Sequence, residues 1–269
     1  MSRKTIEVGG IRLSALIEGN ELGPWVTFAH SLATDASLFE EQAKALGVRY
    51  RTLRFDMRGH GRSEAPPRPY ALSDLVGDVV GLWGALEIQR SHFVGLSIGG
   101  MTGFGLARDH PDRLVSLSGC DWRADAPEFF RNLWDQREAI VAEQGLEGIV
   151  EPTIQTWFTE AARRRDPALI ERVSAMIRGT SRDGYLGCGD ALRRLDYKRR
   201  LGEIGTPTLM IVGDADGPHP QEMKAMAAMI PGTRLVEIGP AGHLSNLEQP
   251  EAFNAALIGF LDSFDGRSR

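Results

Sequence analysis

The chain has 269 residues and a mass of 29.5 kDa, which suits a single α/β domain that carries an insertion. Hydrophobic residues make up 42% of the sequence and charged residues 25%, as in a globular protein with a sizeable core, so disorder is not indicated. The net charge of −5 and the pI near 5.7 provide no basic surface for a polyanion. We therefore expect no nucleic-acid partner.

Targeting and membrane signals are not recognisable in the sequence. The N-terminus, MSRKTIEVGG, lacks the apolar core of a secretory signal, and no apolar run approaches the roughly 18 residues of a membrane span. The two cysteines, Cys120 and Cys188, are too few for a disulfide framework and are expected to be free. These features predict a cytoplasmic protein without a membrane partner.

The first part of the chain predicts strands that alternate with helices. Residues 5–8 and 11–17 alternate in polarity around Gly9-Gly10, which predicts an antiparallel hairpin at a sheet edge. DMRGHGRSEAPP, at 56–67, is too rich in glycine and proline for anything but a loop. Buried strands are predicted at 25–30, 50–56 and 91–96, with helices at 37–46 and 72–86, the second capped by Ser73.

The second part continues this alternation around a helical insertion. Strands are predicted at 113–120, 206–214 and 233–239, and helices from Ile98, at 221–230 and at 250–264. Between them, residues 122–195 show no strand signal. The alternation predicts a mostly parallel sheet of about eight strands, with helices on both faces and residues 1–121 and 196–269 as the core. We interpret residues 122–195 as a helical cap over the carboxyl ends of the strands, where ligands bind in such folds.

The strongest local signal is the segment Gly95-Leu96-Ser97-Ile98-Gly99. This G-x-S-x-G pattern directly follows a predicted strand and directly precedes a predicted helix. Such a turn strains the backbone at the serine and exposes the hydroxyl, while the flanking glycines leave room for strand and helix. The placement favours Ser97 as a nucleophile over a plain glycine-rich turn.

A serine nucleophile requires a general base, and His243 is the predicted one. Serine attack needs a nearby base that is oriented by a third group, in the chain order serine, acid, histidine. His243 follows the last predicted strand and satisfies this order. His30 is its serious rival because it ends a strand at the same edge. His92, His110 and His219 are interpreted as structural, and His60 lies in the glycine-rich loop.

Asp216 is the predicted acid of this arrangement. It follows the strand at 206–214, so it falls at the same sheet edge as Ser97. Asp214, beside it, and Asp121, after the strand at 113–120, remain alternatives. Backbone donors must also stabilise the oxyanion of the intermediate. We assign these donors to the N–H groups of Ile98 and Leu32.

The chain resembles the α/β-hydrolase superfamily, and more narrowly the 3-oxoadipate enol-lactonases of aromatic catabolism. The supporting stretches are FDMRGHGRS, HFVGLSIGGMTG, DYKRRLGEIGTPTLMIVGDAD and GPAGHLSNLEQPEAFN, together with the cap stretch from WFTEAARRR to ALRRLD. The resemblance covers nearly the whole chain and places Ser97, Asp216 and His243 at the family's triad positions. AHSLATD, SGCDWRADAP and GPHP depart from the family's pattern. These departures concern the substrate and not the fold.

The resemblance implies a substrate with a free carboxylate, for which cap arginines are candidate partners. Arg137 and Trp134 are selected as substrate-binding residues, and Trp157 is a further candidate for packing or for the substrate wall. Arg123 and Arg131 are alternatives to Arg137. The run Arg163-Arg164-Arg165 is interpreted as a solvated surface.

The sequence thus predicts hydrolysis of a small lactone or ester through an acyl-enzyme, with 3-oxoadipate enol-lactone as the foremost substrate. No histidine or cysteine cluster has zinc-ligand spacing, and no cofactor or metal is expected. A general carboxylesterase, a carbon–carbon bond hydrolase and a cofactor-free haloperoxidase-like enzyme stay open, because all would use the same triad. A non-catalytic receptor of the same fold is the distant alternative.

Overall fold

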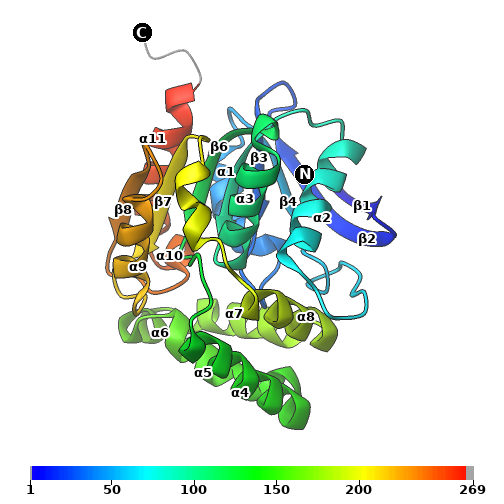
Figure 1. Ribbon diagram of the computed structural model, residues 1–269, viewed down its shortest axis with the longest axis vertical. Helices are drawn as coiled ribbons and strands as arrows, with labels where there is room; N and C mark the ends of the chain where they lie inside the picture. The colour runs from blue at the N-terminus through cyan, green and yellow to red at the C-terminus, as the bar shows by residue number, and fades with distance from the viewer. Residues whose placement is uncertain (1, 265–269) are drawn as a thin grey trace.

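The computed structural model describes residues 2–264 and is built around one eight-stranded sheet with the order β1-β2-β4-β3-β5-β6-β7-β8 (Figure 1). β2 is antiparallel to β1 and β4, and the remaining neighbours are parallel. This confirms the predicted sheet. The strands are β1 (Ser2–Val8), β2 (Ile11–Gly19), β3 (Trp25–Ala29), β4 (Arg51–Phe55), β5 (Ser91–Leu96), β6 (Leu114–Cys120), β7 (Thr208–Gly213) and β8 (Arg234–Ile238).

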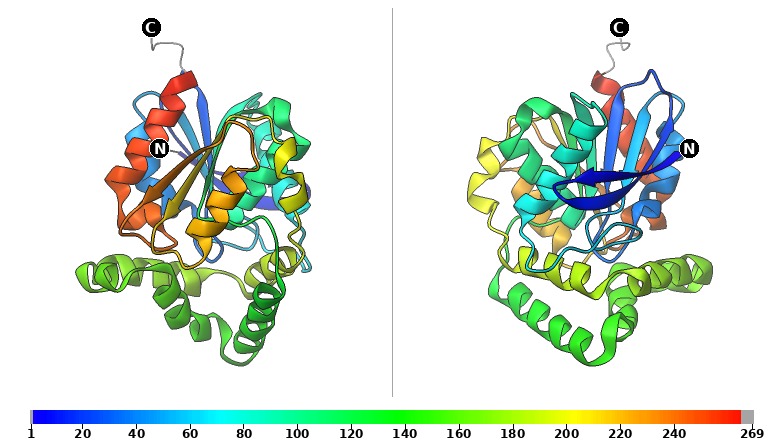
Figure 2. Two further views of the ribbon diagram at one scale, coloured as in Figure 1. Left: turned by 60° about the vertical axis from the view of Figure 1, so that its left-hand side comes forward. Right: turned by 90° about the vertical axis from the view of Figure 1, so that its right-hand side faces the viewer.

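Helices cover both faces of the sheet (Figure 2). One face carries α1 (Glu40–Leu46) and α11 (Pro250–Leu261), and the opposite face carries α2 (Leu72–Ala85), α3 (Ile98–Asp109) and α9 (His219–Ala227). The short helix α10 (Ser245–Glu248) precedes α11. Single 3₁₀ turns lie at Ala36–Phe39, Pro111–Arg113, Gly145–Ile149, Lys198–Glu203 and Asp262–Phe264.

One N-cap and two helix starts differ from the prediction. α1 begins at Glu40 and not at Ser37, because the 3₁₀ turn Ala36–Phe39 precedes it. The N-cap of α2 is Ala71 and not Ser73, because the Asp74 carboxylate accepts the backbone N–H of Ala71 at 2.8 Å. α9 begins at His219, two residues before the predicted start. Pro220 does not prevent this, because the first turn of a helix has no internal acceptor for its N–H groups.

The segment between β6 and β7 is helical, and its helices lie together beyond one edge of the sheet (Figure 1). Within the described chain it holds no named strand, only a single bridge between Asp125 and Asp196. Its helices are α4 (Glu128–Gln144), α5 (Val150–Trp157), α6 (Glu160–Arg165), α7 (Pro167–Gly179) and α8 (Arg182–Arg193). We propose that residues 122–195 form the cap of the domain. Residues 265–269, at the end of the predicted core, lie outside the described residues.

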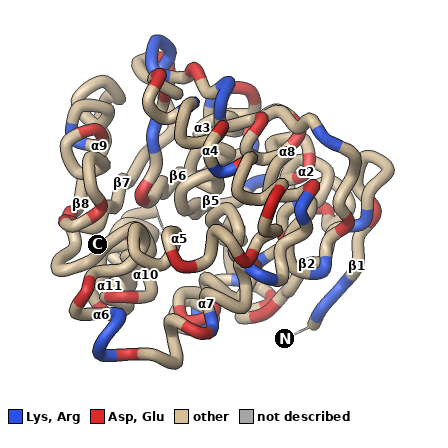
Figure 3. Tube along the Cα trace, turned by 90° about the horizontal axis from the view of Figure 1, so that it is seen from below, with Lys and Arg blue, Asp and Glu red and all other residues tan. Residues whose placement is uncertain are grey.

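Ion pairs fasten the cap to the core loop that precedes α2. Arg68 of that loop pairs with Asp190 of α8 at 2.8 Å and with Glu138 of α4 at 2.8 Å. Arg193 of α8 also reaches Glu138, at 2.7 Å. A network of this kind holds the two cap helices in a fixed position relative to the loop. Seen from the cap side, positively and negatively charged residues are interspersed along the chain (Figure 3).

Both cysteines are free, as predicted, and the structure also shows that both are buried. Burial raises the pKa of the Cys188 thiol to about 12, and the pKa of Cys120 is also raised by burial. Neither thiol is therefore set up as a nucleophile. Among the described helices, none is long and apolar enough to cross a membrane.

Candidate active site

Ser97 occupies the sharp turn between β5 and α3. Its backbone has φ 57° and ψ −116°, a conformation that non-glycine residues adopt only under strain. Its N–H donates to the carbonyl of Cys120 at 2.8 Å, which holds the turn against β6. The serine therefore stands at the carboxyl edge of the sheet, at the point where strand gives way to helix.

The glycines of this turn are required by close backbone contacts. A Cβ atom on Gly95 would collide with the carbonyl of Gly99, and one on Gly99 would collide with the carbonyl of Ala29 at the end of β3. Gly99 thus keeps the start of α3 close to the loop that follows β3.

Replacing Gly99 with alanine is expected to lower the free energy of unfolding by about 2 kcal/mol, because the added methyl overpacks rigid backbone. Gly77→Ala is the matched control: Gly77 lies on an exposed face of α2 with no atom near its added methyl, so alanine there should be neutral or stabilising. Denaturant titrations of the two variants measure the difference. Equal stabilities would contradict the packing explanation.

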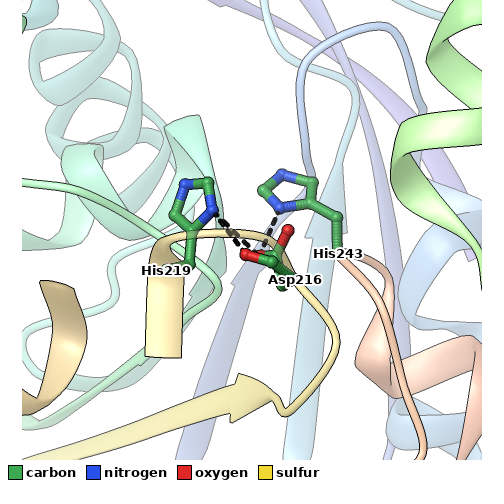
Figure 4. A group of neighbouring side chains, drawn as sticks. All are labelled: Asp216, His219 and His243. Carbon is green, nitrogen blue, oxygen red and sulfur yellow. Dashed lines mark hydrogen bonds and ion pairs between the residues drawn. The ribbon is translucent and has the colours of Figure 1, made fainter. Parts of the chain in front are cut away.

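Asp216 and His243 meet at the same edge of the sheet (Figure 4). Asp216 follows β7 and His243 follows β8, and His243 Nδ1 lies 2.8 Å from Asp216 Oδ2. Burial raises the pKa of the Asp216 carboxyl, but the charges and hydrogen bonds of two neighbouring histidines outweigh burial and lower this pKa below its ordinary value. Asp216 is therefore an ionised carboxylate that fixes the orientation of His243.

The cap holds His243 from its other side. The backbone N–H of His243 donates to the carbonyl of Trp157 at 2.9 Å, and the two rings stack with centroids 5.8 Å apart. Buried Glu248 ties the same region together, since it accepts from the N–H of Gly242 and from the hydroxyl of Thr159, both at 2.7 Å. The position of the imidazole thus depends on contacts from both core and cap.

The two alternative acids are engaged elsewhere. Asp214 accepts the backbone N–H of Ala241 at 3.0 Å. Asp121 accepts the N–H of Gly213 at 2.8 Å and the hydroxyl of Ser245 at 2.6 Å. In the part of the chain that the structure describes, neither carboxylate hydrogen-bonds a histidine. Burial, followed by the nearby charge of Asp216, raises the pKa of Asp121 well above its ordinary value.

His30, the rival base, binds backbone. Its Nδ1 lies 2.7 Å from the carbonyl of Ser31, and its Nε2 accepts the N–H of Met57 at 2.9 Å. Burial lowers the pKa of His30. The side chain therefore joins the loop after β3 to the loop after β4.

His219, which is interpreted as structural from the sequence, lies beside Asp216 in this site. Its Nδ1 lies 3.3 Å from Asp216 Oδ2, its ring centroid is 5.4 Å from that of His243, and it lines the same cavity as Ser97. The available signal was its spacing, because residues three apart at the start of a helix lie on one side.

The oxyanion donors stay predictions. Ile98 is the first residue of α3, so its N–H has no acceptor within the helix. Leu32 follows β3 and lines the cavity beside Ala33, whose φ of 57° bends the loop.

A cavity of ≈ 140 Å³ joins these core residues to the cap. A cavity of roughly 150 Å³ accommodates a benzene-sized molecule, so this one suits a small substrate. Trp134 and Arg137, the two predicted substrate-binding residues, are among its lining residues. The others are Leu32, Ala33, Ser97, Met101, Arg123, Phe130, Leu133, Thr153, Thr156, Trp157, Tyr185, Leu192, Asp216, His219 and His243.

The two arginines of this cavity differ in their partners. Arg123 pairs with Glu222 at 3.0 Å, and its guanidinium lies 4.5 Å from the ring centre of Phe130. Arg137 donates to the hydroxyls of Thr153 at 3.0 Å and Tyr185 at 2.9 Å, and forms no ion pair with any residue from 2 to 264. Arg137 is therefore the cation of the cavity without an internal counter-charge.

Among the described residues, one group of side chains could hold a metal ion: Asp216, His219 and His243. Their possible ligand atoms all lie within 4.8 Å of one another. Both Nδ1 atoms face the same carboxylate oxygen at hydrogen-bonding or ion-pairing distance. This arrangement is that of two imidazoles sharing one carboxylate, which needs no ion to explain it.

Comparison with known proteins shows the family of the chain. A family model described as alpha/beta hydrolase fold matches residues 24–250. The 3-oxoadipate enol-lactonase 2 of Acinetobacter baylyi is 31% identical over 264 residues, which cover 98% of each chain. The resemblance noted in the sequence is thereby confirmed.

Solved structures show the same relationship. The enol-lactonase from Burkholderia xenovorans superimposes with a TM-score of 0.93 at 34% identity, covering 96% of this chain and all of that one. A thermophilic esterase from Thermogutta terrifontis has a TM-score of 0.91 at 30% identity and covers 98% of this chain and 99% of that one. Both similarities span the cap as well as the core.

Proposed function

Since the chain belongs to the α/β-hydrolase fold family and is a hydrolase, we propose that Ser97 is its nucleophile, His243 its general base and Asp216 its orienting acid. The observation that carries the proposal is the contact of His243 Nδ1 with Asp216 in the cavity that Ser97 also lines. This contact occupies one ring nitrogen. It leaves Nε2 to exchange a proton with the serine hydroxyl.

The reaction follows from these positions in two steps. Ser97 Oγ attacks the substrate carbonyl while His243 takes its proton, and the N–H groups of Ile98 and Leu32 stabilise the oxyanion. His243 returns the proton to the leaving oxygen, so that an acyl-enzyme remains. It then activates water, which releases the acid and restores the serine. With a lactone, the leaving oxygen stays attached to the acyl chain.

We propose a small lactone or ester with a free carboxylate as substrate, and 3-oxoadipate enol-lactone foremost. Arg137 supports this choice, because it presents a guanidinium without an internal counter-charge to the cavity and could bind a carboxylate. Trp134, buried beside Tyr185 with ring centres 5.5 Å apart, would form the apolar wall. The enol-lactonase relatives support the same substrate.

The direct test measures release of 3-oxoadipate from its enol-lactone by mass spectrometry, with subtraction of spontaneous hydrolysis. Purified protein should release the product rapidly. Release at the background rate, together with hydrolysis of simple esters, would overturn the enol-lactone assignment and favour the second candidate, a general carboxylesterase. That candidate is supported by the similarity to the Thermogutta esterase.

Arg137→Gln is expected to lower kcat/KM for the carboxylate-bearing lactone by about 10- to 100-fold, because one charge-assisted hydrogen bond is lost. Hydrolysis of a neutral ester such as p-nitrophenyl acetate should change little. Arg131→Gln, an exposed arginine of the same helix that does not line the cavity, is the matched control. Equal losses on both substrates would contradict carboxylate recognition by Arg137.

A further inference from the structure

Two imidazoles approach one oxygen of Asp216 (Figure 4). His243 Nδ1 lies 2.8 Å from Asp216 Oδ2, and His219 Nδ1 lies 3.3 Å from the same atom. His219 Nδ1 is also 3.1 Å from the backbone carbonyl of Asp216. A serine hydrolase triad needs only one histidine on its acid, so the mechanism leaves His219 without a role.

The position of His219 is defined by the helix that it starts. His219 is the first residue of α9, directly after Pro218, and lies three residues after Asp216. Its side chain is 18% exposed, whereas the side chain of His243 is 9% exposed. His219 thus has access to solvent protons while it contacts the buried carboxylate.

Charged groups from several elements face this pair of histidines. Glu222, one turn further along α9, adds negative charge near His219, but it pairs with Arg123 from the segment after β6. Asp121, at the end of β6, acts electrostatically on Asp216 and His243 and is hydrogen-bonded to Gly213 and Ser245. From the cap, uncharged Trp157 stacks on His243. Among residues 2–264, Asp216 is therefore the one carboxylate in direct contact with both imidazoles.

We propose that His219 is a positioning residue: it shares the Asp216 carboxylate with His243, and its charge shapes the acid limb of the pH–rate profile of the triad. This inference rests on the proposed triad and concerns its working range of pH.

Electrostatics give the reason why the charge of His219 acts on the triad. A single carboxylate compensates one imidazolium, and a second one with its ring centre 5.4 Å away would meet a like charge. Burial lowers the pKa of His219, but the hydrogen bond and charge of Asp216 outweigh burial and raise this pKa above its ordinary value. Once His219 is charged, protonation of His243 becomes less favourable.

The test is the pH dependence of covalent labelling of Ser97 by a fluorophosphonate, which reports the basicity of His243 without any assumption about the substrate. His219→Gln keeps a hydrogen-bond donor but cannot carry the charge. We expect the acid limb of the labelling rate to move to higher pH by about one unit in this variant. Below the midpoint of the acid limb, the ratio of the variant's labelling rate to that of the wild type should therefore be about ten times lower than on the alkaline plateau.

The control is His110→Gln, the same substitution after the last residue of α3, about 18 Å along that helix from Ser97. Its acid limb should match that of the wild type. A His219→Gln profile with an unchanged limb, or with a uniform loss at every pH, would overturn the proposal. Absence of labelling at Ser97 in the wild type would instead overturn the proposed triad, so the two failures are distinguishable.

A second measurement needs no variant. Titration of ¹⁵N-histidine signals in the wild-type protein should show His219 gaining its proton at a higher pH than an ordinary histidine does, because its pKa is raised by Asp216. A His219 that gains its proton at or below the ordinary pH would overturn the proposal even if the variant failed to fold.

Discussion

Replacing Ser97 with alanine is expected to lower kcat by about 10⁶-fold on every substrate, because the variant has no oxygen to form an acyl-enzyme. The remaining rate over spontaneous hydrolysis would come from binding and from the oxyanion donors. Steady-state rates with p-nitrophenyl acetate and with the enol-lactone measure the effect. Circular dichroism and thermal unfolding establish whether the variant is folded. Alanine at this position, where φ is 57°, has no nucleophilic atom, so no activity is expected to return through the side chain.

Ser118→Ala is the matched control for this result. Ser118 is a buried serine of β6 whose hydroxyl has no hydrogen-bond partner among the described residues, so its loss should leave activity near that of the wild type. Retention of more than one hundredth of the wild-type kcat by Ser97→Ala would show that another group attacks the substrate.

Asp216→Asn is the second substitution with a large expected effect, a loss of about 10⁴-fold in kcat. The amide of asparagine can present its N–H₂ group to His243 Nδ1 and so favour the wrong tautomer. It also removes the negative charge that stabilises the imidazolium during attack. Because Asp216 is shared, His219 would lose its partner as well, and the acid limb of the rate profile should change with the plateau.

Asp121→Asn tests whether the loss of activity comes from the contact of Asp216 with His243 or from the removal of any buried carboxyl near the site. Asparagine at position 121 can accept the N–H of Gly213 and donate to the hydroxyl of Ser245, so both present contacts can be kept. Activity within about tenfold of the wild type is expected, since nothing in contact with His243 changes. If Asp121→Asn were the inactive variant and Asp216→Asn the active one, the acid would be assigned to Asp121.

The fold and the turn around Ser97 were predictable because their signals are local. Short apolar strands bounded by glycine or proline alternate with helical periodicity, and the G-x-S-x-G pattern lies where strand and helix adjoin. Chain order, together with their location directly after predicted strands, then indicated Asp216 and His243 at the carboxyl edge. The order of strands in the sheet and the pairing of Asp121 with Ser245 depend on contacts between distant residues, which no local pattern encodes.

His219 shows why the rest was harder to predict. It lies between two prolines, just before the helix predicted from residue 221, yet both prolines are compatible with the start of a helix. That turn brings the imidazole back over Asp216, three residues earlier. The cap presents the same difficulty, because Arg137 lines the cavity while Arg131 of the same helix is exposed. The direction of each side chain depends on how α4 packs, and its mixed sequence does not reveal this.

The most direct test of the account is peptide mapping after stoichiometric labelling with a fluorophosphonate, because it identifies the attacking atom without reference to any substrate. The proposed triad predicts one adduct per chain, located on Ser97, with labelling abolished in Ser97→Ala and strongly slowed in Asp216→Asn. An adduct on a different residue, or full hydrolytic activity in a protein that is never labelled, would contradict it.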